Sequence, residues 1–263
     1  MNDLSFVENY RPKKKEIKHL RILLLGPTGA GKSSFINSVS SCLRGKINSN
    51  RAFTDATSGN SFTTKFKTHK IKNENSASFY PFVFNDTMGL EPENDHGVHV
   101  EDIKLVMKGH VRENYTFNHK SPLSEGNKRY NPNPTLDDKV HVLVFVVDAG
   151  KVSLMQEDVV KKMKDIRQAA CDLEIPQVAI LTKIDEACPK TKENIQDVYE
   201  SKHLKEKVDM FSQQVGLPQS CIFLVKNYSS ETYTNDYIDT MMLNTLGHII
   251  NYGEDFLNNL QQN

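Results

Sequence analysis

The sequence lacks the features that mark membrane, secreted and general nucleic-acid-binding proteins. Its 33 basic and 33 acidic residues leave no formal net charge, which argues against general nucleic-acid binding. No apolar run approaches the ~20 residues of a membrane span, and residues 1–11 lack the apolar core of a signal peptide. The four cysteines are scattered without a Cys-x-x-Cys pair, as expected of reduced thiols in the cytosol. We therefore expect a cytoplasmic protein without a transmembrane segment.

The chain has 263 residues, which fits one large α/β domain, and no internal repeat is evident. We expect residues 1–19 to form an N-terminal linker or lead-in helix and residues 20–263 to form the domain. Residues 110–138 are polar and contain three prolines. They therefore read as a long insertion, and insertions of this length are usually functional or poorly ordered.

One stretch carries a strand, a glycine-rich loop and a helix in direct succession. Residues 22–25 are a short apolar run that ends at glycine, which is typical of a buried strand. Residues 26–33 have the P-loop spacing, with two glycines four residues apart followed by Lys and Ser. Apolar side chains then recur at helical spacing over residues 35–39. This order of elements is the context in which a P-loop functions.

The residue types in this loop suit a bound polyphosphate. Glycines let phosphate oxygens approach the backbone closely, and successive N–H groups with the following helix N-terminus form an anion site. Lys32 can reach the β- and γ-phosphates, and the Ser33 hydroxyl can ligate Mg²⁺. The predicted nucleotide-binding residues of the loop are Gly26, Thr28, Gly29, Ala30, Gly31, Lys32, Ser33 and Ser34.

A second strand, predicted at residues 79–84, runs into Asp86 and Gly89. An Asp at the end of a strand beside the P-loop strand can hold the water shell of Mg²⁺. Gly89 can offer its N–H to a γ-phosphate because it has no side chain. An Asp-x-x-Gly sequence alone also describes an ordinary turn, but its place after the P-loop favours a functional role.

A third strand, predicted at residues 177–181, is followed by Thr182, Lys183 and Asp185. The Asp185 carboxylate can accept two hydrogen bonds from the N1–H and N2–H groups of guanine, and adenine offers no such pair. The stem of Lys183 can lie along the base, and Thr182 can steady the loop. Asn227, after the last predicted strand, is placed to back the base. The predicted ligands are therefore GTP or GDP with Mg²⁺.

The remaining segments show the periodicity of strands and helices. Residues 62–71 alternate as in a half-exposed strand, and residues 140–148 are almost wholly apolar, as in a strand buried on both faces. Helical patterns cover residues 98–109, 154–173, 194–215 and 236–260. We expect a doubly wound α/β P-loop NTPase fold with a mostly parallel, six-stranded sheet flanked by helices.

With both the phosphate and the guanine motifs placed, the chain resembles a small-GTPase-type G domain. The resemblance is closer to the interferon-induced protein 44 and 44-like family, and it covers nearly the whole chain. The segments that carry it are 9–12, 21–27, 31–35, 86–90, 181–185 and 225–228. The resemblance implies a G domain over residues 20–263 and a cytosolic, interferon-induced protein of antiviral defence and innate immunity.

The resemblance also places the switch threonine at Thr63, with Thr57 and Thr64 as alternatives. Its hydroxyl and backbone would sense Mg²⁺ and the γ-phosphate. Lys32 and Thr63 are thus the predicted catalytic residues. The predicted metal ligands are Ser33, Thr63 and Asp86.

Ras-like enzymes place a water-orienting Gln directly after the glycine of Asp-x-x-Gly. Leu90 stands at that position here, and a leucine cannot orient water. Either hydrolysis is slow, or another side chain performs this task. Arg44, Arg51 and His96 could do so, although each is more simply read as an ordinary surface side chain.

Three functions remain open from the sequence. The first is a slow Mg²⁺-dependent GTPase switch, and the second is a non-hydrolysing GTP-binding module whose nucleotide orders a partner surface. Leu90 favours the second. A P-loop kinase needs an arginine-bearing lid, and the insertion contains only Arg112 and Arg129. Besides guanine nucleotide, the expected partners are a protein effector or a second copy of the chain in nucleotide-dependent self-association.

Overall fold

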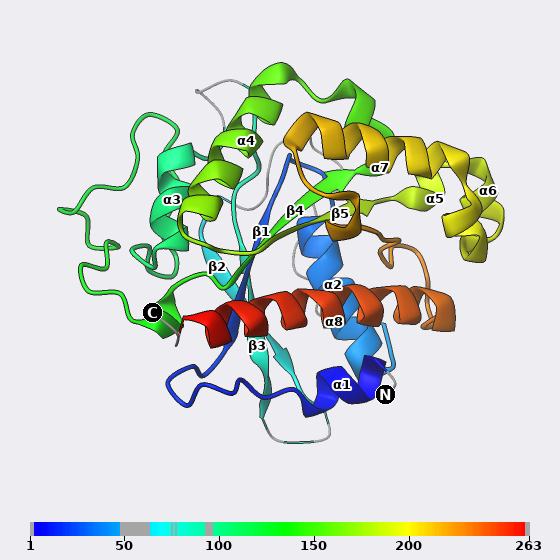
Figure 1. Cartoon of the computed structure of the whole chain (residues 1–263). Helices are drawn as coiled ribbons and strands as arrows, with labels where there is room; N and C mark the ends of the chain where they lie inside the picture. Colours follow the sequence, from blue (N-terminus) through cyan, green and yellow to red (C-terminus); the bar gives the residue numbers. More distant parts are fainter. Residues whose placement is uncertain (1–2, 48–63, 75, 77, 93–96, 261–263) are drawn as a thin grey trace.

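The computed structural model describes residues 3–47, 64–74, 76, 78–92 and 97–260 of the chain. Its strands form a six-stranded sheet in the order β2-β3-β1-β4-β5-β6 (Figure 1). The strands are β1 (Leu20–Leu25), β2 (Lys67–Lys72), β3 (Phe79–Asp86), β4 (Val142–Asp148), β5 (Gln177–Thr182) and β6 (Ile222–Leu224). β2 pairs antiparallel with β3, and the other neighbouring strands pair in parallel. The predicted doubly wound, mostly parallel α/β sheet is therefore confirmed.

Helices cover both faces of the sheet. One face packs against α1 (Asp3–Asn9), α2 (Lys32–Arg44) and α8 (Asp236–Asn259). The other packs against α3 (Val100–Met107), α4 (Glu157–Asp172) and α7 (Lys202–Val215). Every residue of β4 is buried, as in a strand covered on both faces. Among the described residues, no helix is long and apolar enough to cross a bilayer.

The sheet gathers the ends of its parallel strands at one edge. β1 lies between β3 and β4, so strands are added on both sides of it. Loops that leave a sheet at such a point open the crevice in which α/β proteins bind ligands. The register sets Leu24 beside Asp86, and Asp148 beside Thr182. The fold thus brings together motifs that lie far apart in the sequence.

One predicted helix is divided in the structure. Residues 194–215 form a 3-10 helix, η3 (Ile195–Glu200), and then α7. The break falls at Ser201, whose Oγ accepts a hydrogen bond from the N–H of Leu204 (3.2 Å). This bond caps the first turn of α7 and ends the continuous helical pattern. Other short elements are α5 (Ile184–Ala187), α6 (Pro189–Glu193), η1 (Leu136–Asp138), η2 (Ala149–Leu154) and η4 (Gln219–Cys221).

Of the strand predicted at residues 62–71, the structure describes residues 64–71, and among these β2 begins at Lys67. Just before it, the N–H of Phe66 donates to the carbonyl oxygen of Tyr115 (2.8 Å). The carbonyl oxygen of Phe66 in turn accepts a bond from the N–H of Asn114 (2.9 Å). The residue before β2 therefore pairs with the insertion instead of with a strand of the sheet. The sequence gives no signal for this long-range pairing.

The insertion at residues 110–138 runs beside α3 (Figure 1). Its anchor is the buried carboxylate of Asp102 on α3, which accepts bonds from the N–H of Leu123 (2.7 Å) and the hydroxyl of Tyr115 (3.3 Å). Burial raises the pKa of Asp102 above its ordinary value, although both bonds oppose this shift. The insertion is thus fastened both to α3 and to the residue that precedes β2.

Candidate functional site

The glycine-rich loop follows β1 and ends where α2 begins, at Lys32. The Lys32 side chain folds back over the loop, and its Nζ donates to the carbonyl oxygens of Gly26 and Pro27 (2.9 Å each). Lys32 is only 5% exposed, and a buried ammonium requires such acceptors. The loop therefore holds a positive charge at the N-terminus of a 13-residue helix, which is itself favourable to anions.

Two glycines of the loop are required by its close packing. A Cβ atom at Gly26 would lie 1.9 Å from the carbonyl oxygen of Val146. Gly31 has a φ of +90°, and a Cβ there would lie 2.9 Å from Nδ2 of Asn227. These glycines expose the backbone of the loop, and its N–H groups together with Lys32 fit a polyphosphate.

Ser33 and Asp86 meet beside this loop. The Ser33 Oγ donates to Oδ2 of Asp86 (2.8 Å), and Asp86 is 2% exposed. Hydroxyl and carboxylate oxygens are ligands that suit Mg²⁺, which commonly binds through one or two protein groups plus phosphate and water. The pair fits that metal and could supply part of its shell.

The segment after β3 lies against the phosphate loop. The N–H of Leu90 donates to the carbonyl oxygen of Gly26 (3.0 Å). The Leu90 side chain points into the core and is 1% exposed. A Cβ at Gly89 would lie 2.3 Å from Oγ1 of Thr28, so only glycine allows this approach.

Glu91 is a site residue that sequence reasoning missed. Its Oε1 accepts a hydrogen bond from the hydroxyl of Thr28 in the phosphate loop. Two features of the sequence could have indicated it: the carboxylate of Glu91 directly follows Leu90, and Thr28 places a hydroxyl in the phosphate loop.

On the other side of the loop, Thr182 links the end of β5 to the phosphate loop. Its Oγ1 donates to the carbonyl oxygen of Ala30 (2.6 Å). The following residue, Lys183, has a φ of +55°, which turns the chain sharply. Its Nζ forms an ion pair with Oδ2 of Asp148 at the end of β4 (3.1 Å). Asp148 was also missed, although an Asp that closes an apolar strand repeats the pattern seen at Asp86.

Asp185 lies in a chain of ion pairs. Its Oδ2 is 3.6 Å from Nζ of Lys226, and the same Nζ is 2.9 Å from Oε1 of Glu231. Burial alone would lower the pKa of Lys226, but the bond to Glu231 and both carboxylate charges together raise it. Asn227 donates through Nδ2 to the carbonyl oxygen of Gly31 (3.3 Å). The carboxylate predicted to read guanine is thus held beside a fixed cation.

The structure gathers the residues predicted to bind the phosphates and the base at this edge of the sheet, at the ends of β1, β3, β5 and β6. Thr63, Thr57, Arg51 and His96 lie outside the described residues. Thr64 is described, and its carbonyl oxygen accepts a bond from the N–H of Phe117 in the insertion (3.1 Å).

Arg44 does not belong to the site. It is the last residue of α2, about 18 Å along the helix axis from Lys32. Its Nε pairs there with Oε1 of Glu74 (2.8 Å). The sequence-based suggestion that Arg44 orients water is therefore wrong, because the helix carries it away from the phosphate loop.

Comparisons with known proteins agree with this geometry. Residues 21–183 match the family model described as 50S ribosome-binding GTPase. Interferon-induced protein 44 of Mus musculus is 32% identical over 262 residues, covering 100% of this chain and 61% of the relative. Interferon-induced protein 44-like of Homo sapiens is 29% identical over 258 residues, covering 98% and 56%. The predicted resemblance to this family is confirmed, and the chain spans about 60% of the length of the curated relatives it matches.

Among solved structures, a probable GTP-binding protein engB is 14% identical, with a TM-score of 0.43. The match covers 88% of this chain and 98% of that one.

Proposed function

This chain belongs to the GTPase family described as 50S ribosome-binding GTPase, and we propose that it is a guanine-nucleotide switch that hydrolyses GTP slowly with Mg²⁺. The proposal assigns the phosphates to residues 26–34 and Gly89. It assigns the base to Thr182, Lys183, Asp185 and Asn227. Residues 20–263 form the G domain in this proposal, with residues 1–19 as its lead-in.

The observation that carries the proposal is the link between the phosphate loop and the base loop. Thr182 donates to Ala30 (2.6 Å), and Asn227 donates to the neighbouring Gly31 (3.3 Å). A nucleotide that lies across these contacts meets Lys32 at its phosphates and Asp185 at its base. The spacing between the two ends is thus set by the protein before the nucleotide arrives, which lowers the cost of ordering on binding.

The residues of the phosphate side have defined tasks. Lys32 exchanges the carbonyl oxygens of its own loop for phosphate oxygens, so its buried ammonium keeps acceptors throughout. Ser33 and Asp86, already 2.8 Å apart, would hold Mg²⁺. That ion neutralises charge on the phosphates when it is bound. Thr63 is proposed as the threonine that senses the γ-phosphate.

The relatives supply the biological setting of the proposal. The mouse, chimpanzee and human relatives are interferon-induced protein 44. We place this chain in the same response, with antiviral defence, a cytoplasmic location and a protein effector as parts of that proposal. The identity of the bound nucleotide is the property that tests this proposal most directly.

The first test is chemical identification of the nucleotide that copurifies with the full chain. Chromatography after denaturation should show GDP or GTP, and competition binding should favour GTP over ATP. ADP or ATP in the purified protein would contradict the assignment of the base site.

A non-hydrolysing GTP-binding module is the second candidate, and the buried Leu90 side chain favours it. Single-turnover measurement on preloaded GTP separates the two functions. A slow GTPase should release phosphate at or below the intrinsic Ras rate of roughly 10⁻⁴ s⁻¹. If the bound GTP stays intact over many multiples of the time set by this rate, the chain is a binding module only.

A further inference from the structure

Leu90 occupies the position after the Asp-x-x-Gly glycine, but the structure removes it from any chemistry. Its side chain is 1% exposed and packs in the core, and its N–H is bonded to Gly26. The side chain that emerges next to the phosphate loop is that of the following residue, Glu91. A carboxylate, rather than an amide or a cation, is therefore the group available at this place.

Glu91 lies at the end of the loop where the γ-phosphate is proposed to bind. Its carboxylate accepts a hydrogen bond from the hydroxyl of Thr28. That hydroxyl oxygen would lie 2.3 Å from a Cβ at Gly89, the residue assigned to the γ-phosphate. Thr28, Gly89 and Glu91 thus converge on one point, although Thr28 and Glu91 are 63 residues apart.

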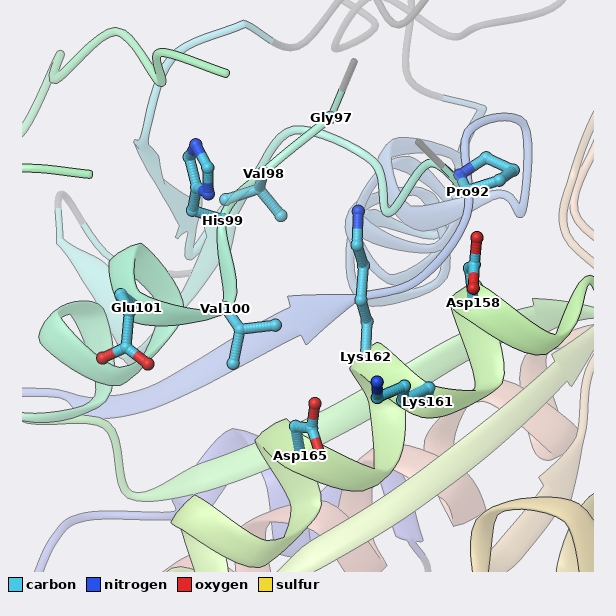
Figure 2. A pocket seen from close by; sticks show the side chains of 10 residues that line it. All are labelled: Pro92, Gly97, Val98, His99, Val100, Glu101, Asp158, Lys161, Lys162 and Asp165. Carbon is cyan, nitrogen blue, oxygen red and sulfur yellow. The ribbon is translucent and has the colours of Figure 1, made fainter. Parts of the chain in front are cut away.

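A lysine on α4 bonds to the backbone of Glu91. Lys162 rises from α4 toward the segment that carries Pro92 and Gly97 (Figure 2), and its Nζ donates to the carbonyl oxygen of Glu91 (2.7 Å). Burial lowers the pKa of Lys162, although Asp158 and Glu91 act against this shift. The bond ties the backbone of Glu91 to α4, while its carboxylate meets Thr28 of the phosphate loop.

A Cβ at Gly97 would lie 2.8 Å from the N–H nitrogen of Glu91, so the returning chain also packs closely on this residue. Glu91 is therefore held through its backbone by Lys162, and its carboxylate accepts a hydrogen bond from the hydroxyl of Thr28. This arrangement suits a group that acts on a small neighbour such as water.

We infer that Glu91 orients the attacking water in GTP hydrolysis and that Thr28 positions its carboxylate; this inference rests on the proposed GTPase function. The carboxylate accepts a hydrogen bond from the water, whose oxygen forms a bond to the γ-phosphorus. The bond from that phosphorus to the β–γ bridging oxygen breaks, and GDP leaves with the electron pair. Both protons of the water end on the released phosphate.

The test compares Glu91→Gln with the parent and with Glu125→Gln, which removes an exposed carboxylate in the insertion. Three quantities are measured for each protein: affinity for GTP and GDP, the single-turnover rate, and affinity for GDP with aluminium fluoride, a mimic of the transferred phosphoryl group. Glu91→Gln should bind GTP and GDP within about twofold of the parent but hydrolyse GTP at least about tenfold more slowly. Glu91→Gln should also bind GDP with aluminium fluoride no more tightly than GDP alone, unlike the parent. Glu125→Gln should match the parent in all three quantities.

Thr28 provides an independent route should Glu91→Gln fail to fold. Thr28→Val removes the hydroxyl that contacts Glu91 and should slow hydrolysis, whereas Thr28→Ser should restore it.

Each other outcome overturns the inference. A parent that does not bind GTP contradicts the proposed function itself, and a parent that binds GTP without hydrolysing it leaves Glu91 no water to orient. Equal rates in Glu91→Gln and the parent reject the assignment while leaving the proposed function intact. Tighter GTP binding with an unchanged rate would show that Glu91 repels the γ-phosphate instead.

Discussion

The phosphate side and the base side of the site are built in different ways. On the phosphate side, Lys32 and Asp86 are 5% and 2% exposed, and their hydrogen bonds go to backbone carbonyls and to Ser33. On the base side, the side chains of Lys183 and Asp185 are 31% and 25% exposed and are held by ion pairs. The charges are thus buried at one end and solvent-accessible at the other.

This difference assigns different energies to the two sides. A buried charge that loses its partner pays the full cost of desolvation, so changes on the phosphate side should be severe. A partly exposed ion pair is screened by water and salt, and its loss is modest. Affinity should therefore depend mainly on the phosphate loop, and discrimination between bases should depend on Asp185.

The largest effect is expected from Lys32→Ala. This change removes a charge-assisted contact to phosphate from a buried lysine, and GTP affinity should fall by at least about 3 kcal/mol, or roughly 150-fold. Lys164→Ala, an exposed lysine on α4, is the matched control and should bind as the parent does. Titration calorimetry gives both values, and equal affinity of Lys32→Ala and the parent would refute the phosphate-loop assignment.

Asp185→Asn should change base preference rather than abolish binding. The amide offers one donor and one acceptor, which matches xanthine, whereas the carboxylate only accepts. GTP should weaken by about 1–3 kcal/mol, or roughly 5- to 150-fold, and XTP should strengthen.

Competition of GTP, XTP and ATP for both proteins measures this shift. Glu186→Gln removes a neighbouring exposed carboxylate and should keep the preference of the parent. An unchanged preference in Asp185→Asn would remove Asp185 from the base site.

A smaller effect is expected from Asp148→Asn, which breaks the 3.1 Å pair with Lys183. Because the Lys183 side chain is 31% exposed, although that of Asp148 is only 11%, water screens the pair and GTP affinity should fall by no more than about 1 kcal/mol, roughly fivefold. Preference for GTP over XTP should persist, since Asp185 is untouched. A loss of GTP affinity as large as that of Lys32→Ala would show that water does not screen the Lys183–Asp148 pair, contrary to the comparison of the two sides.

The smallest effect expected is that of salt on the difference in GTP affinity between the parent and Asp148→Asn. Raising the ionic strength toward 1 M shortens the Debye length to about 3 Å. The gap in affinity between the parent and Asp148→Asn should then shrink, whereas the loss in Lys32→Ala should persist. A gap that does not respond to salt would mean that the Lys183–Asp148 pair is effectively buried.

Sequence reasoning located the contiguous motifs better than the contacts between them. The predicted helix after the phosphate loop is observed as α2, because strand, loop and helix follow one another directly and their signals are local. It failed at residues 194–215, where one serine cap divides the helix, and at Arg44, whose direction depends on the length of α2. Asp148 and Glu91 were missed because each acts on a residue far away in the chain.

The sequence by itself determined the chemistry available to this protein: glycines that bare a backbone, a lysine and a serine at a helix start, and carboxylates at strand ends. Periodicity and spacing are sufficient for these features because they are properties of neighbouring residues. Only the tertiary structure decided that the Leu90 side chain faces the core, that Glu91 meets Thr28 across 63 residues, and that Lys226 flanks Asp185. Those outcomes depend on how separate strands pack against one another, and the packing free energy that selects them is shared by the whole core.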